Sequence, residues 1–160
     1  MCWLCDNSGA TPSDYKNHVQ NLIASYGWAV QGVERDGNHP PWAYTVGLSA
    51  RELPELVVTG TDLAPGAELL NRAAILSRDN PGLLVPGTHA RISGTAIQLI
   101  EVTRPWAHLN MAVVLYGEGI RALQLVCADD AGHWPWEAAY AGQQGGQPVL
   151  GRQKNGRRTA

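Results

Sequence analysis

Helical and strand-like hydrophobic patterns follow one another along this chain without the regular strand–helix alternation that builds a parallel α/β protein. One long amphipathic pattern near the start is followed by short apolar runs with period two, and turn residues separate them. A length of 160 residues is sufficient for one hydrophobic core. We therefore expect a single α+β domain, in which a mostly antiparallel sheet packs with about three helices.

Residues 11–26 carry the clearest helix pattern. Thr11 suits the N-cap, Pro12 suits the first helical position, and Asp14 occupies the acidic position of a capping box. Gly27 supplies a residue for the left-handed C-terminal cap. One apolar stripe at helical spacing contains Tyr15, Val19, Leu22, Ile23 and Tyr26.

The rest of the chain alternates between strand and helix signals as far as residue 127. Helices are predicted over residues 65–78 and 105–116, the second as one continuous helix. Strands are predicted over residues 28–34, 42–48, 56–59, 88–93, 96–103 and 120–127. From residue 128 onward the periodicity gives way to Gly, Pro and Trp, which predicts irregular loops.

The charge is distributed unevenly. The last nine residues contain Arg152, Lys154, Arg157 and Arg158 and no acidic residue, whereas the remainder holds eight basic residues against 14 acidic ones. An acidic body is a poor match for the phosphates of nucleic acid, so we expect no nucleic-acid partner. We assign residues 1–151 to the domain, with a cysteine-containing segment at 1–10, and residues 152–160 to a basic, disordered tail.

No apolar leader follows Met1, and no apolar run reaches the length of a membrane span. We therefore expect a cytoplasmic protein with no membrane partner. Ten arginines outnumber the two lysines, Lys16 and Lys154, which favours a bacterial source. The oligomeric state is left open by these patterns.

Cys2 and Cys5 form a Cys-x-x-Cys pair, which is the strongest chemical signal in the chain. Such a pair supplies two of the four ligands of a zinc or iron site, or a redox dithiol. No second pair follows, so the other metal ligands would come from distant residues: His39, His108, Cys127 or His133. Two reduced thiols packed beside Trp3 are the structural alternative.

Two loop regions supply further candidate ligand-binding residues. His39 lies in a loop before a predicted buried strand that contains Tyr44, and Glu55 follows that strand. If the fold brings them together, His39 and Glu55 would form an acid–base pair. The alternative is that His39 caps a turn, Tyr44 is core and Glu55 binds backbone.

The second region contains Asp130, His133 and Trp136. Asp129, Asp130 and Gly132 are typical of a turn, and Trp134-Pro135-Trp136 forms a stiff aromatic wall that would either line a pocket or seal the core. We expect a ligand pocket where the His39 loop meets the loop of residues 130–136.

Several motifs appear together in a characteristic order. They are residues 39–48 (HPPWAYTVGL), 53–56 (LPEL), 123–126 (LQLV), the Asp130-x-Gly132-x-x-Pro135-Trp136 pattern and 147–151 (QPVLG). In this arrangement the chain resembles the bacterial family of domain-of-unknown-function proteins numbered 4262 (DUF 4262), over about residues 15–151. The resemblance brings no established activity. It implies an aromatic residue where this chain has Cys127, so Cys127 departs from the family pattern.

The sequence therefore favours a small accessory protein that binds a ligand or a metal. A metal- or thiol-dependent modifying enzyme that uses Cys2 and Cys5 is the first alternative. A protein-interaction module that uses exposed tryptophans is the second. Common phosphate-loop, zinc-protease and serine-hydrolase motifs are absent, which argues against the common enzyme classes and leaves enzyme activity open.

Overall fold

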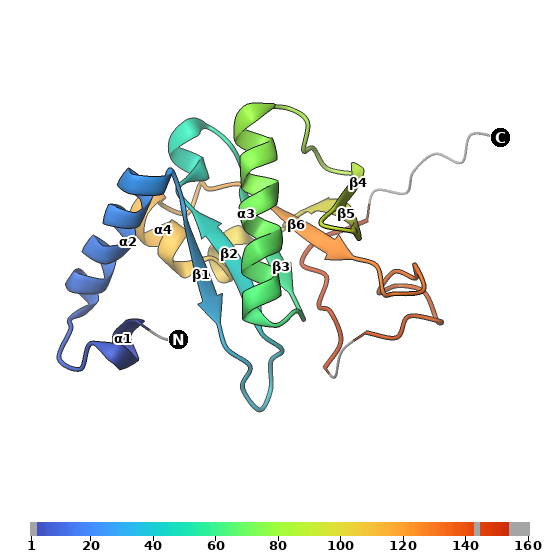
Figure 1. The fold of residues 1–160 in the computed structure, drawn as a ribbon, viewed down its shortest axis with the longest axis horizontal. Helices are drawn as coiled ribbons and strands as arrows, with labels where there is room; N and C mark the ends of the chain where they lie inside the picture. The colour runs from blue at the N-terminus through green and yellow to red at the C-terminus, as the bar shows by residue number, and fades with distance from the viewer. Residues whose placement is uncertain (1–2, 143–144, 154–160) are drawn as a thin grey trace.

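A computed structural model of the chain, which describes residues 3–142 and 145–153, contains one six-stranded sheet (Figure 1). The strand order is β1-β2-β3-β6-β5-β4, and only the neighbours β3 and β6 are parallel. The strands are β1 (Ala29–Val33), β2 (Trp42–Val46), β3 (Glu55–Thr59), β4 (His89–Ile92), β5 (Thr95–Glu101) and β6 (Ala122–Cys127). The α+β fold with a mostly antiparallel sheet is thereby confirmed.

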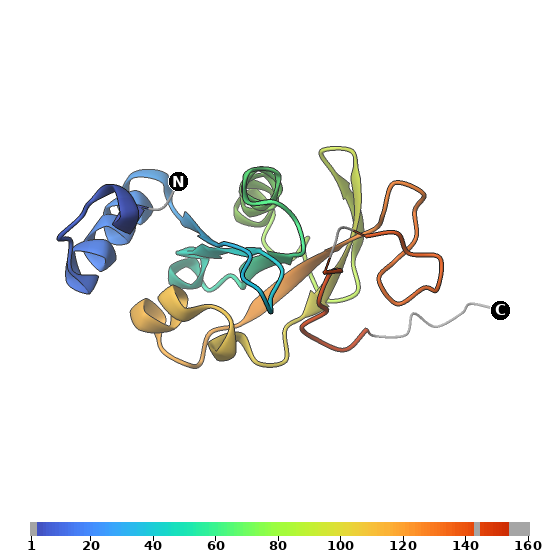
Figure 2. The ribbon, with the colours of Figure 1, turned by 90° about the horizontal axis from the view of Figure 1, so that it is seen from below.

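Helices cover both faces of the sheet. Among the described residues the α-helices are α1 (Trp3–Asp6), α2 (Pro12–Tyr26), α3 (Leu63–Asp79) and α4 (Asn110–Tyr116). Figure 2 shows α3 on one face of the sheet and α4 on the opposite face. Leu70 and Ala74 of α3 belong to one buried cluster. Val19 of α2 belongs to a second, together with Ala112 of α4 and the preceding Leu109. The sheet therefore separates two hydrophobic cores.

Helix α2 forms for the local reasons that its sequence predicts. The Thr11 side chain accepts a hydrogen bond from the backbone N–H of Asp14, and the Asp14 carboxylate accepts one from the backbone N–H of Thr11. Gly27 ends the helix with φ of 92°, in the left-handed region that glycine adopts without strain. The predicted capping box and C-terminal cap are both confirmed.

The helix predicted over residues 105–116 is wrong as a continuous element. A 3₁₀ turn, η2 (Pro105–Ala107), and the separate helix α4 replace it, because Leu109 takes a non-helical backbone conformation with φ of −112° and ψ of 59°. Side chains of β2 bind the freed backbone groups. The Trp42 indole donates to the His108 carbonyl at 3.2 Å, and the Tyr44 hydroxyl accepts from the Met111 N–H at 3.1 Å. Tertiary contacts therefore outweigh the helical pattern.

Residues 145–151, which we call the C-terminal strap, run back against the sheet after the chain has left β6 (Figure 1). The Thr103 N–H donates to the Leu150 carbonyl at 3.0 Å. The side chain of Gln124, a residue of β6, donates to the Pro148 carbonyl and accepts from the Leu150 N–H. A Cβ atom at Gly151 would overlap the Glu101 carbonyl oxygen, so the strap can lie this close to β5 only with glycine there. Of the tail predicted over 152–160, only residues 152 and 153 are described.

Candidate functional site

A polar cavity of about 510 Å³ opens beyond the carboxyl ends of β3 and β6. We call it the switch-point pocket, because β3 and β6 are the pair at which the sheet switches from antiparallel to parallel pairing. It is lined by residues 60, 61, 65, 68 and 69 after β3, by 93 and 95 of the β4–β5 hairpin, by 127–130 after β6, and by 140–142 and 147.

The close approach of two backbone segments forms one wall of this pocket. Gly60 follows β3 with φ of 67°, and a Cβ atom there would overlap the Gly146 carbonyl oxygen and lie 2.9 Å from the Gln147 Cα. A larger residue at position 60 would therefore be strained and would push the C-terminal strap outward. Glycine at position 60 lets the strap cross the end of β3.

The Gln147 side chain forms a second wall by binding the end of β6. Its Oε1 accepts from the Cys127 N–H at 2.8 Å, its Nε2 donates to the Cys127 carbonyl at 2.9 Å, and Nε2 also lies 2.9 Å from the Tyr140 hydroxyl. Burial raises the pKa of the Cys127 thiol to about 11, so the sulfur is a protonated thiol at neutral pH. Such a thiol is a weak nucleophile and a weak metal ligand.

The loop over residues 128–142 folds around the Asp129 carboxylate. This carboxylate accepts hydrogen bonds from the backbone N–H groups of Ala131, His133 and Ala141 at 2.8–3.0 Å, and the His133 Nδ1 lies 3.4 Å away. The Ala141 N–H and the other donors hold the pKa of Asp129 below its ordinary value. Asp129 therefore closes the loop, and the neighbouring exposed Asp130 lines the switch-point pocket.

The predicted aromatic wall lies on this same loop. The Trp134 and Trp136 rings stack with centroids 5.7 Å apart and an interplanar angle of 8°, and Trp134 meets the His89 ring edge-on. Trp136 is 37 % exposed. Neither tryptophan nor His133 lines the switch-point pocket, so the structure places Asp130 in the cavity and leaves His133 and Trp136 on the outer part of the loop.

A second cavity, of about 350 Å³, contains His39. We call it the histidine pocket, and its lining is His39, Pro40, Trp42, Thr59, Ala107, His108, Pro148 and Leu150. The strap contributes Gln147 to the switch-point pocket but Pro148 and Leu150 to the histidine pocket. The single pocket expected between the His39 loop and residues 130–136 is thus replaced by two cavities with the strap between them.

Glu55 lies at the opposite end of β2 from His39. His39 lies just before the start of β2, where Trp42 pairs with Thr59 at the end of β3. Glu55 is the first residue of β3 and therefore lies at the other end of the β2–β3 ladder. His39 is exposed and its Nδ1 lies 3.1 Å from Asp36. The hypothetical His39–Glu55 acid–base pair is not formed, because β2 and β3 are antiparallel and the two residues flank opposite ends of their ladder.

The fully buried Glu55 carboxylate instead organises the turn after β2. It accepts from the backbone N–H groups of Gly47, Leu48 and Ser49 at 2.9–3.4 Å, and from the Thr45 and Ser49 hydroxyls at 2.7 and 2.8 Å. These N–H groups belong to the start of the 3₁₀ turn η1 (Leu48–Arg51), so Glu55 acts as its capping anion. This matches the structural alternative for Glu55.

Tyr44 is a buried core residue on the face that packs against α4. Burial raises the pKa of Tyr44 to about 12, and the hydrogen bond from the Met111 N–H opposes that change only in part. Tyr44 lines neither the switch-point pocket nor the histidine pocket. Its position matches the core alternative rather than a ligand-binding role.

Only some of the predicted metal ligands lie within the described residues. Cys2 and the Cys5 side chain lie outside the described part of the chain, so the Cys-x-x-Cys prediction stays a prediction. Among residues 3–142 and 145–153, no group of three or more His, Cys, Asp or Glu side chains is placed to hold a metal ion. His39 and His108 share one cavity, Cys127 lines another, and His133 pairs with Asp129.

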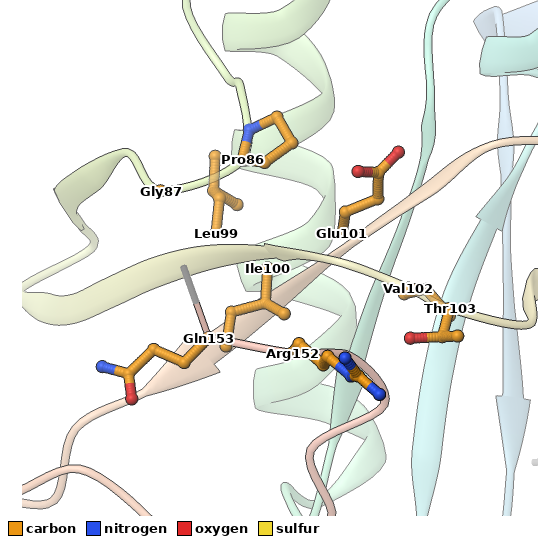
Figure 3. A pocket seen from close by; sticks show the side chains of 9 residues that line it. All are labelled: Pro86, Gly87, Leu99, Ile100, Glu101, Val102, Thr103, Arg152 and Gln153. Carbon is orange, nitrogen blue, oxygen red and sulfur yellow. The ribbon is translucent and has the colours of Figure 1, made fainter. Parts of the chain in front are cut away.

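A cavity of about 630 Å³ lies beside the C-terminal half of β5 and the residues that follow it. Figure 3 shows Leu99 and Glu101 on one side of the strand and Ile100, Arg152 and Gln153 on the other. Arg152 and Gln153 form part of its wall at the last described residues, and the chain continues beyond them. Its wall lies next to the end of the described residues, and we therefore base no proposal on it.

Sequence reasoning missed the two glutamines that build the site. Gln124 is fully buried, donates to Pro148 and Thr59, and accepts from the Leu150 N–H, while Gln147 binds Cys127. The signal was present, since a glutamine in the middle of the apolar LQLV run is unusual and needs buried partners. What could not be known was that the partners lie in the strap.

No helix within the described residues is long and apolar enough to cross a membrane. The model of the DUF4262 family, described as a domain of unknown function, matches residues 22–141. No curated protein and no solved structure matches the chain significantly. The matched region contains the whole sheet and all but the last segments of both cavities. The chain therefore belongs to the DUF4262 family of domains of unknown function.

Proposed function

We propose that this protein binds a small polar molecule in the switch-point pocket. The carrying observation is the convergence of four separate chain segments on one polar cavity at the carboxyl ends of the parallel pair. Its walls are held by hydrogen bonds of Gln147 and Asp129 rather than by loose side chains. A site with such fixed walls needs little rearrangement to accept a ligand.

The charges around the cavity indicate which ligands it favours. Glu68, Asp129 and Asp130 line it, and no lysine, arginine or histidine is among the described lining residues. An anion would face uncompensated negative charge, whereas an ammonium or guanidinium group would find a partner in the exposed Asp130. We therefore propose a small molecule that is rich in hydroxyl or amide groups and is neutral or positively charged.

A binding role fits this pocket better than thiol chemistry does. Cys127 is the cysteine that lines it, and burial raises the pKa of that thiol to about 11. A nucleophilic cysteine needs a depressed pKa and a nearby cation, and the described lining supplies none. A bacterial source, predicted from the arginine-rich composition, and a cytoplasmic location, predicted from the hydropathy pattern, are part of this proposal.

The test varies the charge of the ligand and, separately, removes the charge of Asp130. The full chain is titrated with spermidine, glucose and citrate while backbone amide NMR shifts are followed. We expect spermidine or glucose to shift the Thr61, Ala128 and Ala141 amides, and citrate to shift none of them. Asp130→Asn should weaken spermidine binding about fivefold, because one exposed charge partner is lost. Glu118→Gln removes an exposed acid outside the pocket and should leave binding unchanged.

Three outcomes would contradict the proposal. Citrate could bind in the pocket as well as spermidine, which would overturn the charge argument. Shifts could instead spread evenly over the acidic surface and weaken equally in Asp130→Asn and Glu118→Gln, which would mean that spermidine binds as a diffuse counterion. The absence of any amide shift with spermidine, glucose or citrate at 10 mM would count against a polar site of this kind.

A protein-interaction role is the second candidate, and the exposed tryptophans favour it. Trp106 is 47 % exposed and Trp136 is 37 % exposed, and exposed tryptophans are common anchors of protein interfaces. Analytical ultracentrifugation of the full chain and of a Trp106→Ser, Trp136→Ser double variant tests self-association. A self-associating chain that becomes monomeric in the variant would support an interface.

A further inference from the structure

The histidine pocket differs from the switch-point pocket in its chemistry. Its walls are largely apolar, formed by the Trp42 indole, Pro40, Pro148, Leu150 and the Ala107 methyl group. Among the described residues that line it there is no aspartate, glutamate, lysine or arginine. The segments that form it come from the β1–β2 connection, the end of β3, the η2 turn and the C-terminal strap.

The polar side chains at the wall other than the two histidines already have partners. The Thr59 hydroxyl donates to the Pro148 carbonyl at 2.6 Å and accepts from Gln124 Nε2 at 3.0 Å. The Trp42 Nε1–H donates to the His108 carbonyl. These groups hold the walls in place, and their donors are already used. Among the side chains of the described lining, the groups left to hydrogen-bond a ligand are therefore the two imidazoles.

The two imidazoles are not equivalent. His39 is exposed, and its Nδ1 lies 3.1 Å from the Asp36 carboxylate, so Nε2 is the ring nitrogen that this contact leaves free. His108 is half-buried, and its side chain forms no hydrogen bond with any described residue. Burial lowers the pKa of His108, so its ring is neutral at pH 7 and offers one donor and one acceptor.

We propose that the histidine pocket is a second binding site, which takes a small, flat, uncharged aromatic or heteroaromatic molecule that hydrogen-bonds to His108. A planar ring fits walls made of an indole, two prolines and a leucine. A charged ligand would lose hydration without gaining an opposite charge from the lining. At about 350 Å³ the cavity is at the small end of ligand sites, which sets the size at one or two rings.

This site stands independently of the proposed function. It uses different residues, a different ligand chemistry and a different face of the strap, so either site can fail without the other. The strap is common to both, because Gln147 lines one cavity while its neighbour Pro148 lines the other. An experiment must therefore report which cavity is occupied.

Three probes of matched size separate shape from charge: benzamide, benzoate and benzylammonium. Each is titrated into the full chain at pH 7.5, with the Trp42 Nε1–H and the His108 ring followed by NMR. We expect benzamide to shift both signals, with a Kd on the order of 1 mM for so small a ligand. Benzoate and benzylammonium should bind at least tenfold more weakly, and the Thr61 and Ala128 amides of the switch-point pocket should not respond to benzamide.

A pair of exposed alanines in the two 3₁₀ turns gives a matched variant and control. Ala107→Leu in η2 places extra volume at the mouth of the histidine pocket and should abolish the benzamide shifts, whereas Ala50→Leu in η1 should leave them unchanged. His108→Ala should weaken benzamide binding about tenfold through the lost hydrogen bond. Unchanged circular dichroism melting curves establish that each variant is folded.

The proposal is overturned if benzamide shifts neither reporter at its solubility limit, or if Ala107→Leu binds it as well as Ala50→Leu does. Equal binding of the three probes would also overturn it, because the uncharged lining would then select nothing. Shifts confined to the Thr61 and Ala128 amides would show that the aromatic probe prefers the switch-point pocket.

Discussion

The Gln147 side chain occupies the position of a neighbouring strand at the end of β6, because its amide exchanges two hydrogen bonds with the backbone of Cys127, at 2.8 and 2.9 Å. β3 stops at Thr59, so the Cys127 N–H and carbonyl have no strand partner on that side. One carboxamide supplies both a donor and an acceptor and completes the ladder. The strap is thereby joined to the sheet at the wall of the switch-point pocket.

Gln147→Ala should lower the free energy of unfolding by about 2 kcal/mol, because it leaves the Cys127 N–H and carbonyl without partners. Gln147→Glu should cost at least as much, because a carboxylate cannot donate to the Cys127 carbonyl. Urea denaturation measures both, and hydrogen exchange at the Cys127 amide should accelerate in both variants. Gln153→Ala, at an exposed glutamine, is the control, and an equal loss there would refute the ladder role of Gln147.

Glu55→Ala should destabilise the protein by roughly 3 kcal/mol or more, since it removes the acceptor of three backbone N–H groups at the start of η1. Glu55→Gln keeps the volume and one acceptor oxygen and should cost less. Glu118→Gln, at an exposed acid, should change stability by under about 0.5 kcal/mol. Urea melts of the three variants give the comparison, and a Glu55→Ala protein as stable as the parent would disprove the capping role.

The Cys127 thiol should react slowly with iodoacetamide at neutral pH. Its pKa of about 11 leaves roughly one thousandth of it as thiolate at pH 8. The measurement uses a Cys2→Ser, Cys5→Ser variant, so that only Cys127 can be labelled, and mass spectrometry follows the rate. The rate should rise about tenfold for each pH unit between 8 and 10. A rate at pH 7.5 equal to that of free cysteine would show that the thiol is not protected by burial.

Tyr44 should make the protein sensitive to alkali. Its pKa is raised from 10.0 to about 12, so its contribution to stability is fully present below pH 10 and is lost as the pH rises from 10 through 12. The free energy of unfolding should fall by roughly 2 kcal/mol, because the Tyr44 phenol ionises more readily in the unfolded chain than in the folded one. Urea melts between pH 9 and 11.5 measure it, and Tyr44→Phe should have a flatter profile. Equal slopes in the two proteins would contradict the prediction.

Whether the position of a candidate residue could be predicted depends on how far along the chain its contact partners lie. The patterns around Glu55 and Tyr44 indicated buried positions but not their partners, since the Gly47–Ser49 amides and the Met111 amide reach them only in the folded chain. His39 and Glu55 are close in sequence yet flank opposite ends of an antiparallel ladder. Asp130 was correctly expected in a loop, but its cavity depends on Gln147 and Gly60, which pattern reasoning cannot bring together.

The sequence by itself determined what depends on neighbours along the chain. It determined the capped helix α2, the position of β2, the α+β class and the DUF4262 family, but not that both faces of β2 would be buried, since Ala43 and Thr45 are buried along with Tyr44 and Val46. Capping hydrogen bonds and side-chain periodicity act over a few residues, so local sequence is enough to specify them. Only the tertiary structure decided that β6 inserts beside β3, that the helix predicted over residues 105–116 breaks at Leu109, and that the strap lines two separate cavities. These outcomes depend on which buried polar groups find partners across the sheet, and no spacing along the chain fixes those contacts.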